Sequence, residues 1–179
     1  PIVQWFSRLL DRLTLAICDG AFVVSEDLQA IMIEQYGHWI EKKLFLNRNG
    51  VNPEQFRPLN NRQAIFSYRR SLGIGADSCV IGYVGKALPH HRLDVVARLV
   101  GEARDVPLKL LIAGNVAAVS GEELERVGCG NVILLGQIPY DCVPLFLNAC
   151  DILVLPHGPS YKGRLHQSPI KLFEYMAVG

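Results

Sequence analysis

Apolar side chains recur along this chain with two alternating periods, one typical of helices and one typical of buried strands. From residue 2 to residue 17 they follow the spacing of one helix face, which predicts a helix. A short strand is predicted at 21–25 and a helix at 26–37, with Ser25 placed to cap that helix. The next apolar run, 43–51, predicts a strand that leads into an Asn-Gly turn signal.

The stretch 52–63 interrupts this pattern. It contains two prolines and three asparagines and shows no apolar periodicity. Such a composition is typical of a linker. We therefore expect two regions along the chain, residues 1–58 and residues 59–179.

Beyond the linker, apolar strands alternate with helical patterns to the end of the chain. The predicted strands are 79–85, 108–114, 131–136 and 151–156, and the predicted helices are 91–104, 120–127, 140–149 and 168–177. Strands that are apolar along their whole length are typical of a parallel sheet with helices on both faces, so we expect an α/β fold. Gly85, Gly114 and Gly136 end three of these strands. The carboxyl ends of such strands form the edge at which open α/β sheets bind ligands.

Composition and charge exclude several classes of function. The formal net charge is +1, so nothing in the overall charge favours nucleic acid as a partner. The five cysteines are odd in number and form no Cys-x-x-Cys pair, which is typical of reduced thiols in a cytosolic protein. No spacing of histidines, cysteines and acids matches a metal site, and we expect none.

The first candidate site is the basic loop that follows Gly85. Lys86, His90, His91 and Arg92 lie within it, just before a predicted helix. Backbone N–H groups at a helix start, together with cationic side chains, suit a phosphate group. A solvated basic loop with no ligand explains these residues equally well, and the residues alone leave both readings open.

The second candidate site is the stretch 157–171, which is rich in Pro, Gly and Ser and contains no acid. It follows a predicted strand and leads to a helix with Ser168 as its cap and Pro169 at its first position. The next acidic residue is Glu174, inside that helix. A carboxylate beside a phosphate site is suited to accept hydrogen bonds from sugar hydroxyls. A Glu174 side chain that points to solvent is the alternative. The cationic side chains of this stretch are His157, Lys162, Arg164, His166 and Lys171.

Several of these motifs occur together in one known family. They are “NRNGVNPEQFRP”, “IGYVGKALPHHRLDVV”, “NVILLGQIPYDCVPLFLNACDILVLP” and “SPIKLFEYMAVG”. In this order they resemble the retaining glycosyltransferases of family 4, in the subgroup with Ser-Pro before the Glu-Tyr-Met-Ala helix. The resemblance implies the GT-B fold, with two Rossmann-like domains. Residues 1–58 would be the end of the acceptor-side domain and the linker, and 59–179 the nucleotide-sugar-binding domain, cut before its last strand.

The resemblance also assigns roles to residues. It implies that Lys86, His91 and Arg92 bind the diphosphate of the nucleotide sugar and that Glu174 binds the ribose. The first glutamate of the family's Glu-x7-Glu pair falls on His166, a departure that leaves open how the sugar ring is held. The resemblance assigns no catalytic residue; His166 is a candidate for that role and for a sugar contact. The remaining contacts implied are Ser168, Pro169 and Ile170 for the sugar or phosphate, and Gln137 and Ile138 for the base.

The function expected from this resemblance is transfer of a sugar from a nucleotide diphosphate sugar to an acceptor hydroxyl, with retention of configuration. We expect no metal and no cofactor, a donor of the UDP or GDP type, and a carbohydrate or lipid-linked acceptor. The protein would be cytoplasmic, and the resemblance allows peripheral association of the full-length protein with a membrane. The chain alone would be inactive, since half of the active site would lie outside it. A non-catalytic nucleotide-binding module is the alternative, and a sugar-nucleotide epimerase is a third hypothesis.

Overall fold

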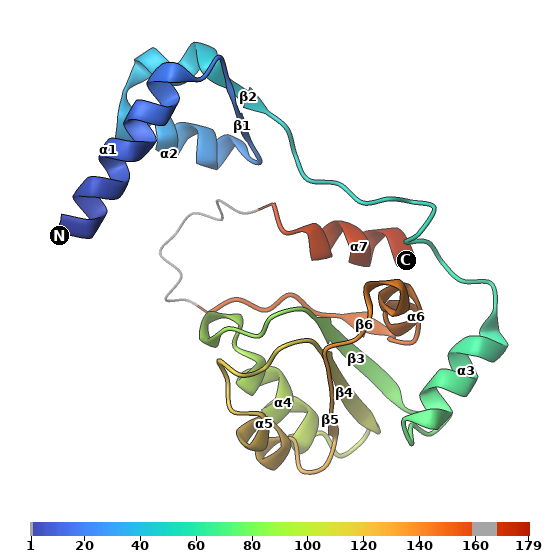
Figure 1. The fold of residues 1–179 in the computed structure, drawn as a ribbon. Helices are drawn as coiled ribbons and strands as arrows, with labels where there is room; N and C mark the ends of the chain where they lie inside the picture. The colour runs from blue at the N-terminus through green and yellow to red at the C-terminus, as the bar shows by residue number, and fades with distance from the viewer. Residues whose placement is uncertain (1, 159–167) are drawn as a thin grey trace. The chain divides into compact units, whose positions relative to one another are not determined.

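A computed structural model describes residues 2–158 and 168–179 (Figure 1). Within these residues the chain forms two compact units, which divide after Gly50; residues 168–170 belong to the first unit and residues 171–179 to the second. Phe56, which the sequence places in the linker, is buried in the core of the second unit. That the two regions are an acceptor-side remnant and a nucleotide-sugar-binding domain stays a prediction.

The first unit is a small α/β layer. Its core consists of Leu15, Val23, Ile40 and Leu44. The predicted cap is present, because Ser25 Oγ accepts a hydrogen bond from the Leu28 N–H group. Among the described residues, no helix combines the length and the apolar character that a membrane crossing requires. The elements of the first unit are α1 (Ile2–Ile17), β1 (Ala21–Val23), α2 (Glu26–Tyr36), the 3₁₀ helix η1 (His38–Lys43) and β2 (Leu44–Leu46). Strands β1 and β2 are parallel.

The second unit contains a four-stranded sheet with the order β5-β4-β3-β6, in which every neighbouring pair is parallel. The parallel α/β fold expected from the apolar strands is therefore confirmed. The strands are β3 (Cys79–Val84), β4 (Leu108–Ala113), β5 (Val132–Gly136) and β6 (Ile152–Leu153). The helices are α3 (Arg62–Ser71), η2 (Pro89–His91), α4 (Leu93–Glu102), α5 (Gly121–Val127), η3 (Tyr140–Cys142), α6 (Val143–Asn148) and α7 (Ile170–Val178).

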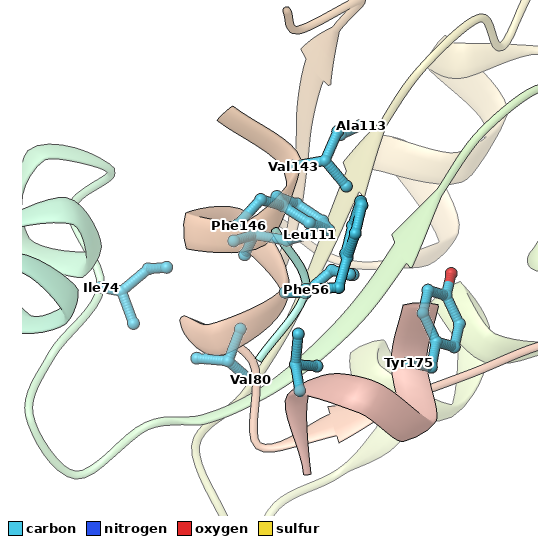
Figure 2. Packing of buried hydrophobic residues seen from close by; sticks show 10 residues of the cluster. Phe56, Ile74, Val80, Leu111, Ala113, Val143, Phe146 and Tyr175 are labelled. Carbon is cyan, nitrogen blue, oxygen red and sulfur yellow. The ribbon is translucent and has the colours of Figure 1, made fainter. Parts of the chain in front are cut away.

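Helices cover both faces of this sheet, and successive strand residues alternate between the two cores. Ile81 of β3 packs with α4 and α5, whereas Val80 packs with α6 and α7 on the opposite face. Figure 2 shows the cluster on the face of α6 and α7, in which Phe56 and Phe146 lie beside Leu111 of β4. Because helices cover both faces, the parts of the sheet that remain uncovered are the ends of its strands.

Helix α3 was missing from the sequence prediction, which left residues 64–78 without an element. The helix begins after Asn61, whose side-chain oxygen accepts a hydrogen bond from the Ala64 N–H group. Its Arg69 donates to the Ala149 carbonyl oxygen and forms an ion pair with Asp151. The other oxygen of Asp151 accepts a hydrogen bond from the Val80 N–H group, so this acid has a structural role at the start of β3.

Other predicted elements are shorter in the structure. The strand predicted at 151–156 pairs only at Ile152 and Leu153. The helix predicted at 140–149 starts as the 3₁₀ turn η3, and the α-helix proper begins at Val143. Pro144 stands in the first turn of α6, where the lack of an N–H group costs nothing.

Two glycines bring the carboxyl ends of β3 and β4 into close approach. Gly85 and Gly114 have φ angles of 121° and 130°, which side chains other than glycine rarely adopt. A Cβ atom at Gly114 would lie 2.1 Å from the Gly85 carbonyl oxygen. Pairing continues past the strands, since the Ala87 N–H group donates to the Asn115 carbonyl oxygen at 2.8 Å. The two loops that leave this edge are therefore held together by backbone.

We predict that Gly114→Ala lowers the free energy of unfolding by roughly 3 kcal/mol, because it adds both backbone strain and an overlap with the Gly85 carbonyl group. Gly130→Ala is the matched control: Gly130 has a φ of 77° but no atom within 4 Å of its added Cβ. This control carries only the strain, about 1 kcal/mol. Urea denaturation of both variants measures the difference. Equal losses in the two variants would contradict the close-approach argument.

Candidate functional site

The carboxyl edge of the sheet holds a small pocket. Its volume is about 200 Å³, and it lies where β3, β4 and β5 give way to their loops. Gln137 and Ile138, the predicted base-binding residues, both line it. Two of the lining residues, Gly85 and Gly114, have no side chain. The lining residues are Val84, Gly85, Ala113, Gly114, Gln137, Ile138 and Val143.

Lys86 is the exposed cation at this edge. It follows Gly85 directly, and its carbonyl oxygen accepts a hydrogen bond of 2.9 Å from the Tyr83 hydroxyl group. The hydroxyl group fixes the backbone here and leaves the ammonium group in solvent. Arg92 differs, because its guanidinium group binds both oxygens of Asp94 at 3.0 and 3.1 Å. Lys86 is therefore better placed to bind an anion than Arg92, whose charge is already paired with Asp94.

His91 is buried and turned toward the protein. Its Nδ1 accepts a hydrogen bond from the Leu88 N–H group at 3.2 Å and lies 2.8 Å from the Tyr83 hydroxyl oxygen. An Nδ1 atom that accepts from an N–H group carries no proton, so the imidazole is neutral. Burial lowers the pKa of His91 to about 4, and the positive charge of Lys171 adds to this effect. As a cation for a diphosphate, the role that the resemblance gave it, His91 does not fit the geometry of this structure.

Lys171 is a cation at this edge to which the sequence assigned no separate role. Its Nζ donates to the Tyr83 hydroxyl oxygen at 3.1 Å and lies 4.5 Å from the centroid of the Tyr83 ring. A Cβ atom added at Gly85 would be 3.1 Å from the same Nζ. Burial lowers the pKa of Lys171, and the charge of Glu174 opposes that shift. Only the fold brings Lys171 to the end of β3, because 88 residues separate it from Tyr83.

Glu174 is buried, with a relative exposure of 6%, and does not point to solvent. Its Oε1 accepts a hydrogen bond of 3.0 Å from the Tyr140 hydroxyl group, which comes from the loop after β5. The Tyr140 ring packs against Phe56 at 5.6 Å between centroids. Burial, and then the hydrogen bond to Glu174, raise the pKa of Tyr140, which therefore remains a donor at neutral pH. The carboxylate is held at the same edge as the two lysines.

Helix α7 is attached to the sheet by another tyrosine. The Tyr175 hydroxyl oxygen accepts a hydrogen bond from the Val84 N–H group at 3.0 Å, at the last residue of β3. Burial raises the pKa of Tyr175, so the hydroxyl group stays neutral. This contact sets the position of Lys171 and Glu174, the neighbouring residues of the same helix, relative to the strand end.

The remaining predicted contacts are less defined. His166 lies outside the described residues, so its candidate roles stay predictions. Ser168 and Pro169 directly precede α7, which begins at Ile170. The Ser168 carbonyl oxygen accepts a hydrogen bond from Asn49, within the first unit.

Among residues 2–158 and 168–179, no group of three or more His, Cys, Asp or Glu side chains is arranged to hold a metal ion.

Comparison with known proteins assigns the chain to a family. Residues 78–179, more than half of the chain, match the family model described as glycosyl transferases group 1. The chain belongs to this family. The curated D-inositol 3-phosphate glycosyltransferase of Corynebacterium urealyticum is 32% identical over 119 residues, which are 63% of this chain and 27% of that protein.

Solved structures of glycosyltransferases share the fold. Anabaena HepE in complex with UDP and glucose has a TM-score of 0.71 at 17% identity, over 96% of this chain and 45% of that one. WaaG, a glycosyltransferase involved in lipopolysaccharide biosynthesis, has a TM-score of 0.64 at 17% identity, over 88% and 41%. The predicted GT-B type of fold is thereby confirmed. The chain spans less than half the length of these structures and about a quarter of the curated relative.

We predict that the neutral state of His91 makes the stability of this family member fall in acid. The unfolded chain protonates His91 near pH 6.5, whereas the folded chain protonates it only near 4. The unfolded state therefore binds more protons between these values, and the free energy of unfolding decreases as the pH falls from about 6.5 to about 4. The loss is on the order of 2–3 kcal/mol at most. Urea denaturation at several pH values measures it.

His91→Asn tests this assignment, because the amide oxygen of asparagine can still accept the Leu88 N–H bond without titrating. The variant should unfold with a shallower pH dependence in this window. His38→Asn, at an exposed histidine, is the control and should leave the wild-type slope unchanged. A wild-type slope in His91→Asn would show that other groups cause the acid sensitivity.

Proposed function

We propose that this chain carries the nucleotide-sugar-binding part of a glycosyltransferase that transfers a hexose from a nucleoside diphosphate hexose to a hydroxyl group of a carbohydrate or lipid-linked acceptor. The reaction breaks the bond between the anomeric carbon and the diphosphate oxygen, whose electron pair leaves with the nucleoside diphosphate. The acceptor oxygen bonds to the same carbon, and its proton passes to the departing phosphate. Retention of configuration rests on the resemblance to family 4.

One observation carries this proposal: Glu174 is buried, yet it is held by Tyr140 at a sheet edge that also presents lysine side chains. Such a carboxylate can accept two hydrogen bonds from the vicinal hydroxyl groups of a ribose. The pocket bounded by Gln137 and Ile138 lies at the same edge and suits a base. A nucleoside diphosphate contains these two parts, joined to an anion.

Charge stabilisation of the leaving group fits the same edge. The departing diphosphate gains negative charge, and fixed cations stabilise it without any reorganisation at the moment of reaction. Lys86 is exposed directly after β3 and is free to approach such a group. We propose that protein cations take this role and that no metal is required. A uridine nucleotide is the first choice, because the HepE structures of the same fold contain UDP or UDP-glucose.

The first test is calorimetric titration of the chain with UDP, GDP and ADP. We expect one of them, UDP by preference, to bind at a single site, and the corresponding nucleoside to bind more weakly. Sugar transfer is then measured with the full-length protein and the matching nucleotide sugar, and the anomeric configuration of the product is read by NMR. Absence of binding by all three nucleotides would contradict the proposed site. Binding without sugar transfer or donor hydrolysis would contradict the enzymatic function.

We predict that Glu174 discriminates ribose from deoxyribose. In the wild-type chain, dUDP should bind roughly tenfold more weakly than UDP, because a hydrogen bond to a charged group is lost. In Glu174→Gln the affinity for UDP should fall, and the difference between UDP and dUDP should shrink to about twofold or less. Glu122→Gln, in the first turn of α5, is the control and should retain the wild-type ratio. A full discrimination ratio in Glu174→Gln would remove Glu174 from the ribose site.

A further inference from the structure

We infer that Lys171 is the second diphosphate-binding cation of this site, and that it takes the place that the resemblance gave to His91. This inference rests on the proposed function. It assigns a ligand contact to a residue of α7 that the sequence places only among the cations of the stretch 157–171, and it makes Tyr83 the residue that positions it.

The first step is the position of the ammonium group. Its Nζ lies at the end of β3, near enough to Gly85 that an added Cβ there would be 3.1 Å away. Gly85 also lines the 200 Å³ pocket and directly precedes Lys86. Lys171 therefore adds a second cation at the strand end from which Lys86 projects. Two cations at one strand end can contact both phosphates of a diphosphate.

The second step concerns the partners of Lys171. An ammonium group has three N–H donors, and among the described residues Lys171 donates a hydrogen bond to the Tyr83 hydroxyl oxygen. No ion pair within 4.0 Å joins it to a described carboxylate. Burial has removed part of its hydration, as its lowered pKa indicates. A half-buried cation in this state gains more from an anionic ligand than a fully hydrated one does.

The third step is the electrostatic link between Lys171 and His91. The Tyr83 hydroxyl group lies between them, 3.1 Å from Lys171 Nζ and 2.8 Å from His91 Nδ1. Two positive charges at this separation would repel each other, and the charge of Lys171 contributes to the low pKa of His91. His91, whose Nδ1 accepts the Leu88 N–H bond, is the group that stays neutral. The cation is thus supplied from α7, and the histidine instead orients the tyrosine.

Lys171→Met tests the inference, with the nucleoside diphosphate that binds the wild-type chain and its nucleoside as the two probes. The variant keeps most of the side-chain volume and loses the charge. We expect the Kd of the nucleoside diphosphate to rise ten- to a hundredfold, the range expected for a charge-assisted hydrogen bond. The Kd of the nucleoside should change by less than about twofold. Lys171→Arg should restore most of the diphosphate affinity.

Lys109→Met is the matched control. Lys109 lies near the amino end of β4, where it donates to the Asn131 side-chain oxygen at 2.8 Å, and its loss should leave both affinities unchanged. Tyr83→Phe is a second variant that removes the hydrogen bond to Lys171 and keeps the ring, and it should weaken the nucleoside diphosphate selectively.

Three outcomes would overturn the inference. In the first, Lys171→Met weakens the nucleoside and the nucleoside diphosphate equally, which would make Lys171 a structural residue. In the second, neither affinity changes in Lys171→Met or in Tyr83→Phe. In the third, the wild-type chain itself binds no nucleoside diphosphate. This last result contradicts the proposed function as well, so the wild-type titration separates the two failures.

Discussion

The Tyr83 hydroxyl group connects the three segments from which the candidate site is built. Its single proton lies within hydrogen-bond distance of two acceptors, the Lys86 carbonyl oxygen in the loop after β3 and Nδ1 of His91 in η2, and its oxygen accepts from Lys171 in α7. Tyr83 itself is fully buried, and burial raises its pKa to about 12, so the hydroxyl group keeps its proton at any physiological pH. A phenylalanine here would fill the same space but would leave the loop, the imidazole and the ammonium group without their common partner.

The parallel register of the sheet explains why this hydroxyl group can serve an edge site at all. Every strand of the second unit runs in the same direction, so all carboxyl ends meet along one edge. Gly85 and Gly114 let two of these ends approach more closely than side chains would allow. Helices cover both faces, and at this edge cations and a buried carboxylate come from loops and from α7.

The sequence predicts the sheet well because its signal is local. Each strand is an uninterrupted apolar run, and the strand-end glycines follow directly, so α/β class and carboxyl edge can be read without tertiary information. Helix α3 escaped prediction because its contacts are long-range: Arg69 binds Ala149 and Asp151, about eighty residues further along the chain. A local clue was present in Asn61, whose residue type favours a helix cap.

Site residues are predicted less completely, for a physical reason. A basic sequence motif records which side chains can carry charge, but burial decides which of them do. His91 lies in a basic loop and is neutral, since its imidazole is enclosed and accepts a backbone hydrogen bond. Lys171 lies in a helix whose sequence gives this lysine no separate role, and the fold places its ammonium group against the Tyr83 hydroxyl group. Neither outcome is contained in the spacing of the residues.

Glu174 is the third charged group whose surroundings the fold determines. It lies three residues after Lys171 in α7, close enough for its negative charge to oppose the fall in the lysine pKa that burial causes. The same carboxylate would repel a diphosphate if it stood alone, and the nearby ammonium group of Lys171 reduces that repulsion. Tyr140, in the loop after β5, donates to Glu174, whereas Tyr83 of β3 accepts from Lys171. One turn of helix thus presents a cation and an anion, the two charges that the proposed contacts to a diphosphate and to its ribose require.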